Sequence, residues 1–287
     1  MTDQTQAPHI FSSARRAAAR DRMVRSANAD ALFLHRRMSE DILDRLADVT
    51  RDFRDALLVG CADAELVAAL RARGLTLTCV DPAALPAIQV GGVQTQEDAL
   101  PFEENSFDLI VAAGTLDSVN DLPGALIVMR RLLRPDGMLI GAFFGAGSLG
   151  KLRRILIAAD DDRPAQRIHP LVDVRAMGDL LSRAGLALPV ADADILTVRY
   201  GSLFALLSDL RAMGAGNMLA SPPPPLTRAS LMRATELFAQ ASDADGKLSE
   251  NFTLIHFAGW KPDPSQPKPA RRGSAAVSLA DALRRKD

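Results

Sequence analysis

The fold is decided by residues 56–81, which read ALLVGCADAELVAALRARGLTLTCVD. The apolar run at 56–59 ends at Gly60 and gives way to apolar residues at helical spacing, which stop before Gly74. TLTCVD (76–81) then supplies a second apolar strand. One helix between two buried strands predicts a parallel pair joined by a right-handed crossover.

The same alternation of strand and helix continues along the chain. Further strands are expected at 93–96, 107–114, 137–145, 187–200 and 251–260, with helices in the gaps that follow 107–114, 137–145 and 187–200, one of them at 201–219. Core strands that lack polar alternation and are separated by helices are typical of a doubly wound sheet covered on both faces. The sequence therefore predicts an α/β fold with one main domain.

Three segments of different character are expected. They are a mobile basic arm (1–30), a main domain (31–261) with an amphipathic cap helix at 33–49 and a helical insertion at 200–245, and a disordered tail (262–287) rich in Pro, Lys, Arg and Ser. The basic arm includes a helical segment with Arg15, Arg16, Arg20, Arg22 and Arg25. Three roles stay open for this helix: binding an acidic partner, lying over the active site as a lid, or facing solvent.

Composition excludes several functions. The 34 basic and 35 acidic residues give a net charge of −1, so no global field would draw the protein to nucleic acid or to an anionic membrane. No metal site is expected, because neither the histidines nor the cysteines show ligand spacing: His9, His35, His169, His256, Cys61 and Cys79. Cys61 is expected to be a small buried side chain rather than a nucleophile.

The cytoplasm is the expected compartment. No apolar stretch approaches the roughly 20 residues of a membrane helix, and the amino terminus lacks the layout of a signal peptide. Residues 11–27 are rich in Arg, Ala and Ser, as organellar transit peptides are, but Asp21 and the absence of a cleavage signal favour a surface helix or arm.

A ligand site is expected where the first two strands end. In an open parallel sheet, ligands bind beyond the carboxyl ends of the strands at the point where strand order reverses. The turn at 60–64 follows the first strand, and Asp81 ends the second, where nucleoside-binding sheets place an acid for ribose hydroxyls. The alternative for Asp81 is a turn cap before Pro82. GCADAE offers one glycine where a dinucleotide turn has three, which disfavours nicotinamide and flavin dinucleotides.

Four segments in sequence order carry a family resemblance: ALLVGCADAEL (56–66), VDPA (80–83), EDALPFEENSFDLIV (97–111) and LLRPDGMLIG (132–141). Together they resemble class I S-adenosylmethionine-dependent methyltransferases. The resemblance implies a Rossmann-like fold with a seven-stranded, mostly parallel sheet whose last strand is antiparallel. It implies S-adenosylmethionine as cofactor, with Asp81 on the ribose and Asp98 and Ala99 framing the adenine. The implied cofactor-binding residues are Gly60, Cys61, Ala62, Asp81, Pro82, Asp98, Ala99 and Ala113, and no catalytic residue is identified.

A narrower resemblance covers nearly the whole chain. It is carried by Phe11 with the arginine cluster and by SVNDLPGAL (118–126), DLLSRAGL (179–186), LLSDLRAMGAGN (206–217) and RRGSAAVSLADAL (271–283). These segments resemble the methyltransferase-fold assembly factors of respiratory complex I, whose bacterial relatives are usually labelled type 11, biotin-synthesis-like methyltransferases. The resemblance implies a protein substrate, a complex I subunit, and hydroxylation of an arginine.

Several residues depart from the family pattern. Leu58 stands where the first strand of the family ends in Asp, Ala62 and Ala64 stand where the loop has glycines, and Asp63 would face the methionine carboxylate. Added methyl groups and a lost charge-assisted contact would weaken cofactor binding roughly 100-fold or more. Asp117 and Ser118 replace a His-Trp pair.

Three hypotheses for function follow from the resemblance and from these departures. The first is a methyltransferase-like enzyme acting on a protein. The second is a non-catalytic assembly chaperone that binds the cofactor weakly or not at all. The third is a small-molecule methyltransferase, which a closed pocket beneath the insertion would favour.

Overall fold

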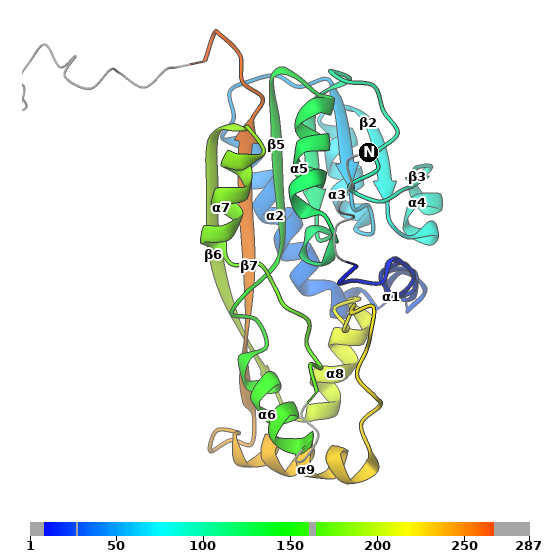
Figure 1. The fold of residues 1–287 in the computed structure, drawn as a ribbon, viewed down its shortest axis with the longest axis vertical. Helices are drawn as coiled ribbons and strands as arrows, with labels where there is room; N and C mark the ends of the chain where they lie inside the picture. Colours follow the sequence, from blue (N-terminus) through cyan, green and yellow to red (C-terminus); the bar gives the residue numbers. More distant parts are fainter. Residues whose placement is uncertain (1–8, 27, 161–164, 267–287) are drawn as a thin grey trace, which may run out of the picture.

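The computed structural model describes residues 9–26, 28–160 and 165–266. Its centre is a seven-stranded sheet in the order β3-β2-β1-β4-β5-β7-β6. The strands are β1 (Asp55–Val59), β2 (Thr76–Asp81), β3 (Val93–Gln94), β4 (Phe107–Ala113), β5 (Leu133–Gly145), β6 (Ala187–Tyr200) and β7 (Leu248–Trp260). β7 runs antiparallel to both β5 and β6, and the other neighbours are parallel. The α/β fold and the antiparallel last strand are confirmed (Figure 1).

Helices cover both faces of this sheet. They are α1 (Ser13–Ser26), α2 (Phe33–Ala47), α3 (Ala64–Ala72), α4 (Ala84–Val90), α5 (Leu122–Leu132), α6 (Gly150–Asp160), α7 (Val174–Arg183), α8 (Leu203–Ala212) and α9 (Arg228–Gln240), with short 3-10 turns at Ala29–Leu32 and Leu116–Ser118. Successive side chains of a strand point to opposite faces. Leu58 of β1 accordingly belongs to the core that contains residues of α2 and α3, whereas Leu57 and Val59 belong to the core that contains residues of α5 and α7. The two cores explain why β1 is apolar at every interior position.

Helix α4 was missing from the sequence-based expectation. It lies between β2 and β3, contains Pro86 in its first turn and ends at Gly91, whose φ is +72°. Its N-cap, Ala83, offers no side-chain acceptor. Asp21 of α1 supplies one instead, since its Oδ1 accepts a hydrogen bond from Leu85 N at 2.9 Å. A residue about sixty positions away thus caps the helix, and no local pattern could announce it.

The insertion is shorter in helix than expected. The predicted helix at 201–219 ends at Ala212, because the chain turns at Gly214 with a φ of +73°. The segment after the turn instead pairs with the start of the chain through an antiparallel bridge between Phe11 and Leu219. Most of the predicted tail, including RRGSAAVSLADAL, lies outside the described residues. Among the described helices, none is long and apolar enough to cross a membrane.

Stability is expected to fall as pH drops below about 6.5, partly because of His256 on β7. This ring is 1% exposed, and neither of its nitrogens has a hydrogen-bond partner among the described residues. Burial, with the charge of Arg45, lowers the pKa of His256 despite the nearby carboxylates of Asp41, Asp192 and Asp194. Below the ordinary pKa the unfolded chain takes up a proton that the folded chain does not, so folding stability is lost.

The measurement is urea unfolding of the wild type and His256→Leu at pH 7.5 and pH 5.5. We expect the free energy of unfolding to fall less steeply with acid in the variant, because one unfolded-state proton acceptor has been removed. Equal pH dependence in the two proteins would show that His256 does not contribute.

Candidate functional site

The turn at 60–64 and Asp81 lie together at the carboxyl ends of β1 and β2, as predicted. Gly60 N donates to Val80 O at 2.8 Å, and Cys61 N donates to Asp81 Oδ2 at 3.0 Å. Gly60 has a φ of +93°, and a Cβ there would lie 2.2 Å from the carbonyl oxygen of Ala113 at the end of β4. The first glycine of the turn is therefore required by the sheet itself.

The carboxylate of Asp81 is fully buried and is held by Arg20 of helix α1. Arg20 Nε donates to Asp81 Oδ1 at 2.8 Å and Nη2 donates to Oδ2 at 2.7 Å, while Nη1 donates to Gly114 O at 3.0 Å. Burial works against the positive charge, yet the Asp81 carboxylate outweighs it and raises the pKa of Arg20. Arg20 therefore stays charged, and it forms a bidentate pair with Asp81 that has almost no solvent contact.

A second arginine of the same helix lies beside the predicted adenine site. Arg16 Nη2 pairs with Glu97 Oε1 at 2.7 Å, its Nη1 donates to Gln96 Oε1 at 3.1 Å, and its Nε donates to Ser118 Oγ at 3.1 Å. Arg16 Nη2 also donates to Thr115 O at 2.9 Å. Arg16 and Glu97 are 5% and 1% exposed.

The other predicted site residues have plainer positions. Asp98 is half-buried and Ala99 is exposed, whereas the neighbouring Glu97 is the buried acid. Pro82 is buried directly after Asp81, and Ala113 is half-buried at the end of β4. Cys61 is buried, and this burial raises the pKa of its thiol, so the group stays protonated. A nucleophilic role for it finds no support in this geometry.

Helix α1 is fixed at its start as well as through its arginines. Asn120 holds both backbone groups of Phe11, accepting from its N at 2.8 Å and donating to its O at 2.9 Å. Ser12 N donates to Met218 O at 2.8 Å. Figure 1 shows α1, in dark blue, between α4 and α8, with which it is in contact. These contacts, with the Asp21 cap on α4, attach the helix along its length.

The departures from the family pattern also find their places. Leu58 is fully buried in the apolar core. Asp63 is the N-cap of α3, accepting from Glu65 N at 3.0 Å, and it also accepts from Ser39 Oγ at 2.5 Å. Together with Met23, Ala62 and Asp63 line a cavity of about 190 Å³. Asp63 therefore accepts hydrogen bonds from Glu65 N and Ser39 Oγ within the protein.

The residues as they lie do not fit S-adenosylmethionine. An ionised carboxylate offers about four acceptor positions. Asp81 uses two on Arg20, one on Cys61 N and one on Ala83 N, at 3.0 Å for each of the backbone groups. Ribose hydroxyls would find no acceptor on Asp81 while Arg20 stays in place. Sequence reasoning missed these arginine pairs, although the spacing of Arg16 and Arg20 by four residues does predict one helix face for both.

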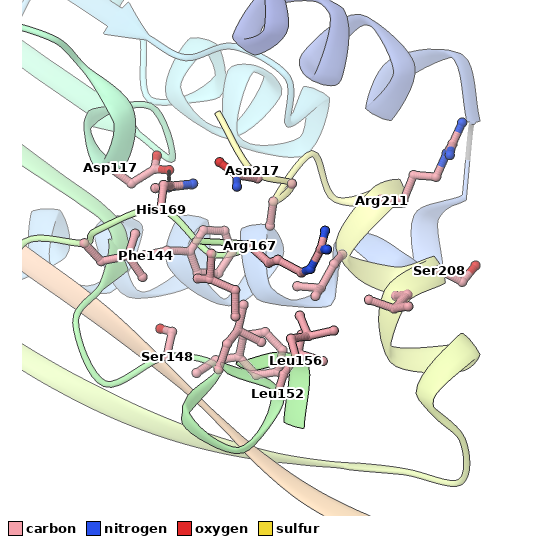
Figure 2. Close-up of a pocket in the computed structure, with 18 of the residues that line it drawn as sticks. Asp117, Phe144, Ser148, Leu152, Leu156, Arg167, His169, Ser208, Arg211 and Asn217 are labelled. Carbon is pink, nitrogen blue, oxygen red and sulfur yellow. Dashed lines mark ion pairs between the residues drawn. The ribbon is translucent and has the colours of Figure 1, made fainter. Parts of the chain in front are cut away.

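A larger cavity of about 540 Å³ lies beyond the loop that follows β4 (Figure 2). Its wall is largely apolar, with Phe144, Leu149, Leu152, Leu156, Ile168, Leu207 and Phe252. Its charged and polar lining residues include Arg22, Asp117, Arg167, His169, Arg211 and Asn217. Figure 2 shows Asp117 beside His169 on one side and Arg211 on the other. The loop at 115–118 separates this cavity from the Arg16 and Arg20 pairs, because Thr115 and Ser118 contact Arg16 and Asp117 faces the cavity.

Asp117 is the acid among the described residues that line this cavity. Its Oδ2 lies 3.7 Å from His169 Nε2, whose ring accepts a hydrogen bond from Met218 N at Nδ1. Burial alone would raise the pKa of Asp117, but His169 and Arg16 outweigh it and keep that pKa below its usual value. Arg167 is neutralised by Asp160, with contacts of 2.6 and 2.7 Å. The described residues contain no cluster of metal-ligating side chains.

The comparison with protein families agrees with this architecture. A family model described as a methyltransferase domain matches residues 31–189, which is more than half of the chain. The chain belongs to this methyltransferase-domain family. The matched segment runs from the residues before α2 to the start of β6, so it contains the Gly60 turn, Asp81 and the loop after β4.

Among curated proteins, the chain is similar to the arginine-hydroxylase NDUFAF5, mitochondrial. It is 34% identical to that protein from Danio rerio over 261 residues, covering 87% of this chain and 81% of the relative. The Rattus norvegicus protein is 34% identical over 267 residues, covering 89% and 78%. A malonyl-[acyl-carrier protein] O-methyltransferase of Gallionella capsiferriformans is 30% identical over 184 residues, covering 64% and 61%.

Solved structures show the same fold at low sequence identity. A putative methyltransferase of Bacillus halodurans is 13% identical, with a TM-score of 0.54, covering 77% of this chain and 97% of that one. The YcgJ protein of Bacillus subtilis is 16% identical, with a TM-score of 0.53, covering 78% and 98%. The methyltransferase fold expected from the sequence is thereby confirmed.

Proposed function

We propose that this methyltransferase-like chain acts on an arginine side chain of a protein substrate, as an assembly factor of the respiratory complex I type. Support comes from the similarity to arginine-hydroxylases over more than three quarters of both chains. The implied substrate is a complex I subunit, and the cytoplasm is the proposed compartment, although these relatives carry the word mitochondrial in their names.

The observation that carries the proposal is the position of Asp117 in the large cavity. Its carboxylate is charged, faces apolar walls, and has His169 as a neighbour at 3.7 Å rather than a bidentate arginine partner. A carboxylate of this kind fits a guanidinium group. Arg22 and Arg211 border the same cavity, so we propose that the substrate carries acidic residues near its arginine.

The test is binding of synthetic peptides that tile the complex I subunits, each arginine peptide being matched by a copy with lysine. We expect the arginine peptide of one region to bind the wild type roughly tenfold or more tightly than its lysine copy does. The same arginine peptide should bind the wild type roughly tenfold or more tightly than it binds Asp117→Asn. Asp192→Asn, on the exposed edge strand β6, is the matched control and should bind like the wild type. The proposal would be contradicted if the arginine and lysine copies bound the wild type equally, or if Asp117→Asn bound the arginine peptide as tightly as the wild type does. A mass gain of one oxygen, from hydroxylation, or of CH2, from a methyl group that replaces a hydrogen, then identifies the modification.

S-adenosylmethionine is the proposed cofactor, with weakened affinity, on Gly60, Asp81 and Asp98, and its binding requires that Arg20 release the Asp81 carboxylate. A second candidate function is supported by the pairing of Asp81 with Arg20, together with Ala62 and Ala64 in the turn. It is a non-catalytic assembly chaperone that keeps the substrate-binding cavity without using the cofactor. Calorimetric titration separates the two: saturation by S-adenosylmethionine supports the enzyme, and no heat up to millimolar concentration supports the chaperone.

A further inference from the structure

We infer that helix α1 occupies the nucleoside cleft, which is the predicted cofactor site beside Asp81 and Glu97. S-adenosylmethionine and S-adenosylhomocysteine can then bind only after α1 has left this cleft. The inference rests on the proposed function only in naming the nucleoside. It concerns Arg20, which pairs with Asp81 at the carboxyl end of β2, and Arg16, which pairs with Glu97 in the loop after β3, and neither arginine lines the large cavity.

The carboxylate of Asp81 has no acceptor position left for a ribose hydroxyl. All four of its acceptor positions are used, and two of these hydrogen bonds come from Arg20. A neutral hydroxyl that entered beside Arg20 would have to displace a charge-assisted bond from a site that excludes water, which is unfavourable. The ribose and the guanidinium therefore compete for the same two oxygens.

Arg16, one helical turn before Arg20, also holds α1 in the cleft. It contacts the side chains of Gln96 and Glu97, which directly precede the predicted adenine residues. It also contacts the side chain of Ser118 and the backbone oxygen of Thr115. Because Arg16 and Arg20 project from one helix, both must leave together. The competitor is thus the whole face of α1 and not one mobile side chain.

Helix α1 is also attached to the protein outside the cleft. Asn120 fixes Phe11, and Asp21 caps α4, so that α1 is held in place by contacts that do not involve Asp81. Ala62 and Ala64, in contrast, remove close backbone approaches that a cofactor would use. Both features favour α1 over the nucleoside as the occupant of the cleft: the contacts outside it stabilise α1, and the alanines weaken nucleoside binding. The apparent affinity for the nucleoside falls with the fraction of molecules in which α1 has left the cleft.

The test is titration with S-adenosylhomocysteine of the wild type, Arg20→Gln and Asn120→Ala, all in the full chain. Arg20→Gln removes one of the two arginine side chains that hold α1 in place, whereas Asn120→Ala loosens only the start of α1. We expect both to bind roughly tenfold or more tightly than the wild type, since each raises the open fraction. Arg25→Gln is the matched control, because Arg25 lies on the same helix with its side chain 64% exposed, and it should bind like the wild type.

Hydrogen exchange of residues 13–26 gives a second readout. In every variant that binds, exchange in α1 should increase when S-adenosylhomocysteine is added. Micromolar binding by the wild type with α1 still protected would overturn the inference. So would two folded variants that bind no more tightly than the wild type; if Arg20→Gln does not fold, Asn120→Ala decides. The peptide test at Asp117 needs no nucleoside, so the two proposals can fail separately.

Discussion

Arg20→Ala is expected to lower the free energy of unfolding by about 3–5 kcal/mol, the usual cost of removing one partner from a buried ion pair. The reason is that the Asp81 carboxyl has no solvent exposure and would be left buried without the guanidinium that pairs with it. Urea unfolding at neutral pH, followed by circular dichroism, measures the loss.

Two further variants establish the cause. Arg25→Ala breaks an exposed pair with Asp21 on the same helix and should change stability by less than about 1 kcal/mol. Arg20→Ala combined with Asp81→Asn should recover part of the loss, because no unpaired charge is left in the core. A loss in Arg20→Ala no larger than in Arg25→Ala would mean that the pair contributes nothing to stability.

Gly60→Ala should destabilise the fold by about 3 kcal/mol or more, from backbone strain and overpacking together. The added Cβ would lie 2.2 Å from the oxygen of Ala113 and 2.5 Å from Cγ2 of Thr115, at a φ of +93°. Neither neighbour is free to move, since Ala113 belongs to β4 and Thr115 is 2% exposed. Thermal unfolding measures the effect.

Gly74→Ala is the matched control, because Gly74 has a similar φ of +81° but nothing within 4 Å of the added Cβ. It should cost about 1 kcal/mol, which is the conformational part alone. The difference between the two variants then measures the close approach of the Gly60 turn to β4. Equal losses would mean that the turn can relax around a methyl group.

Much of the fold could be predicted because its signals are local. The apolar run before Gly60 and the helix that follows it specify β1, α3 and β2 without any distant contact. Helix α4 could not be predicted in this way, since its cap is Asp21 on α1. The helix after residue 201 was predicted too long because its apolar residues continue beyond Gly214, where the chain turns toward Phe11.

The candidate site was predictable in its location but not in its contacts. The position of Asp81 follows from strand order alone. Which of two neighbouring loop acids, Glu97 or Asp98, is buried depends on Arg16, about eighty positions earlier. Sequence periodicity gives the face of a helix and leaves its partner unknown, so the pairing of Arg20 with Asp81 required the structure.

The attachment of Phe11 has a consequence for biosynthesis. Asn120 lies 109 positions after Phe11, and the bridging residue Leu219 comes later still. A polypeptide grows from its amino end, and contacts between distant positions form late. While the chain is still on the ribosome, β1, β2 and the start of α4 are complete before Asn120 and Leu219 have been made. A nascent chain therefore passes through a stage in which Arg20 and Asp21 can already contact Asp81 and Leu85, but Phe11 is not yet held.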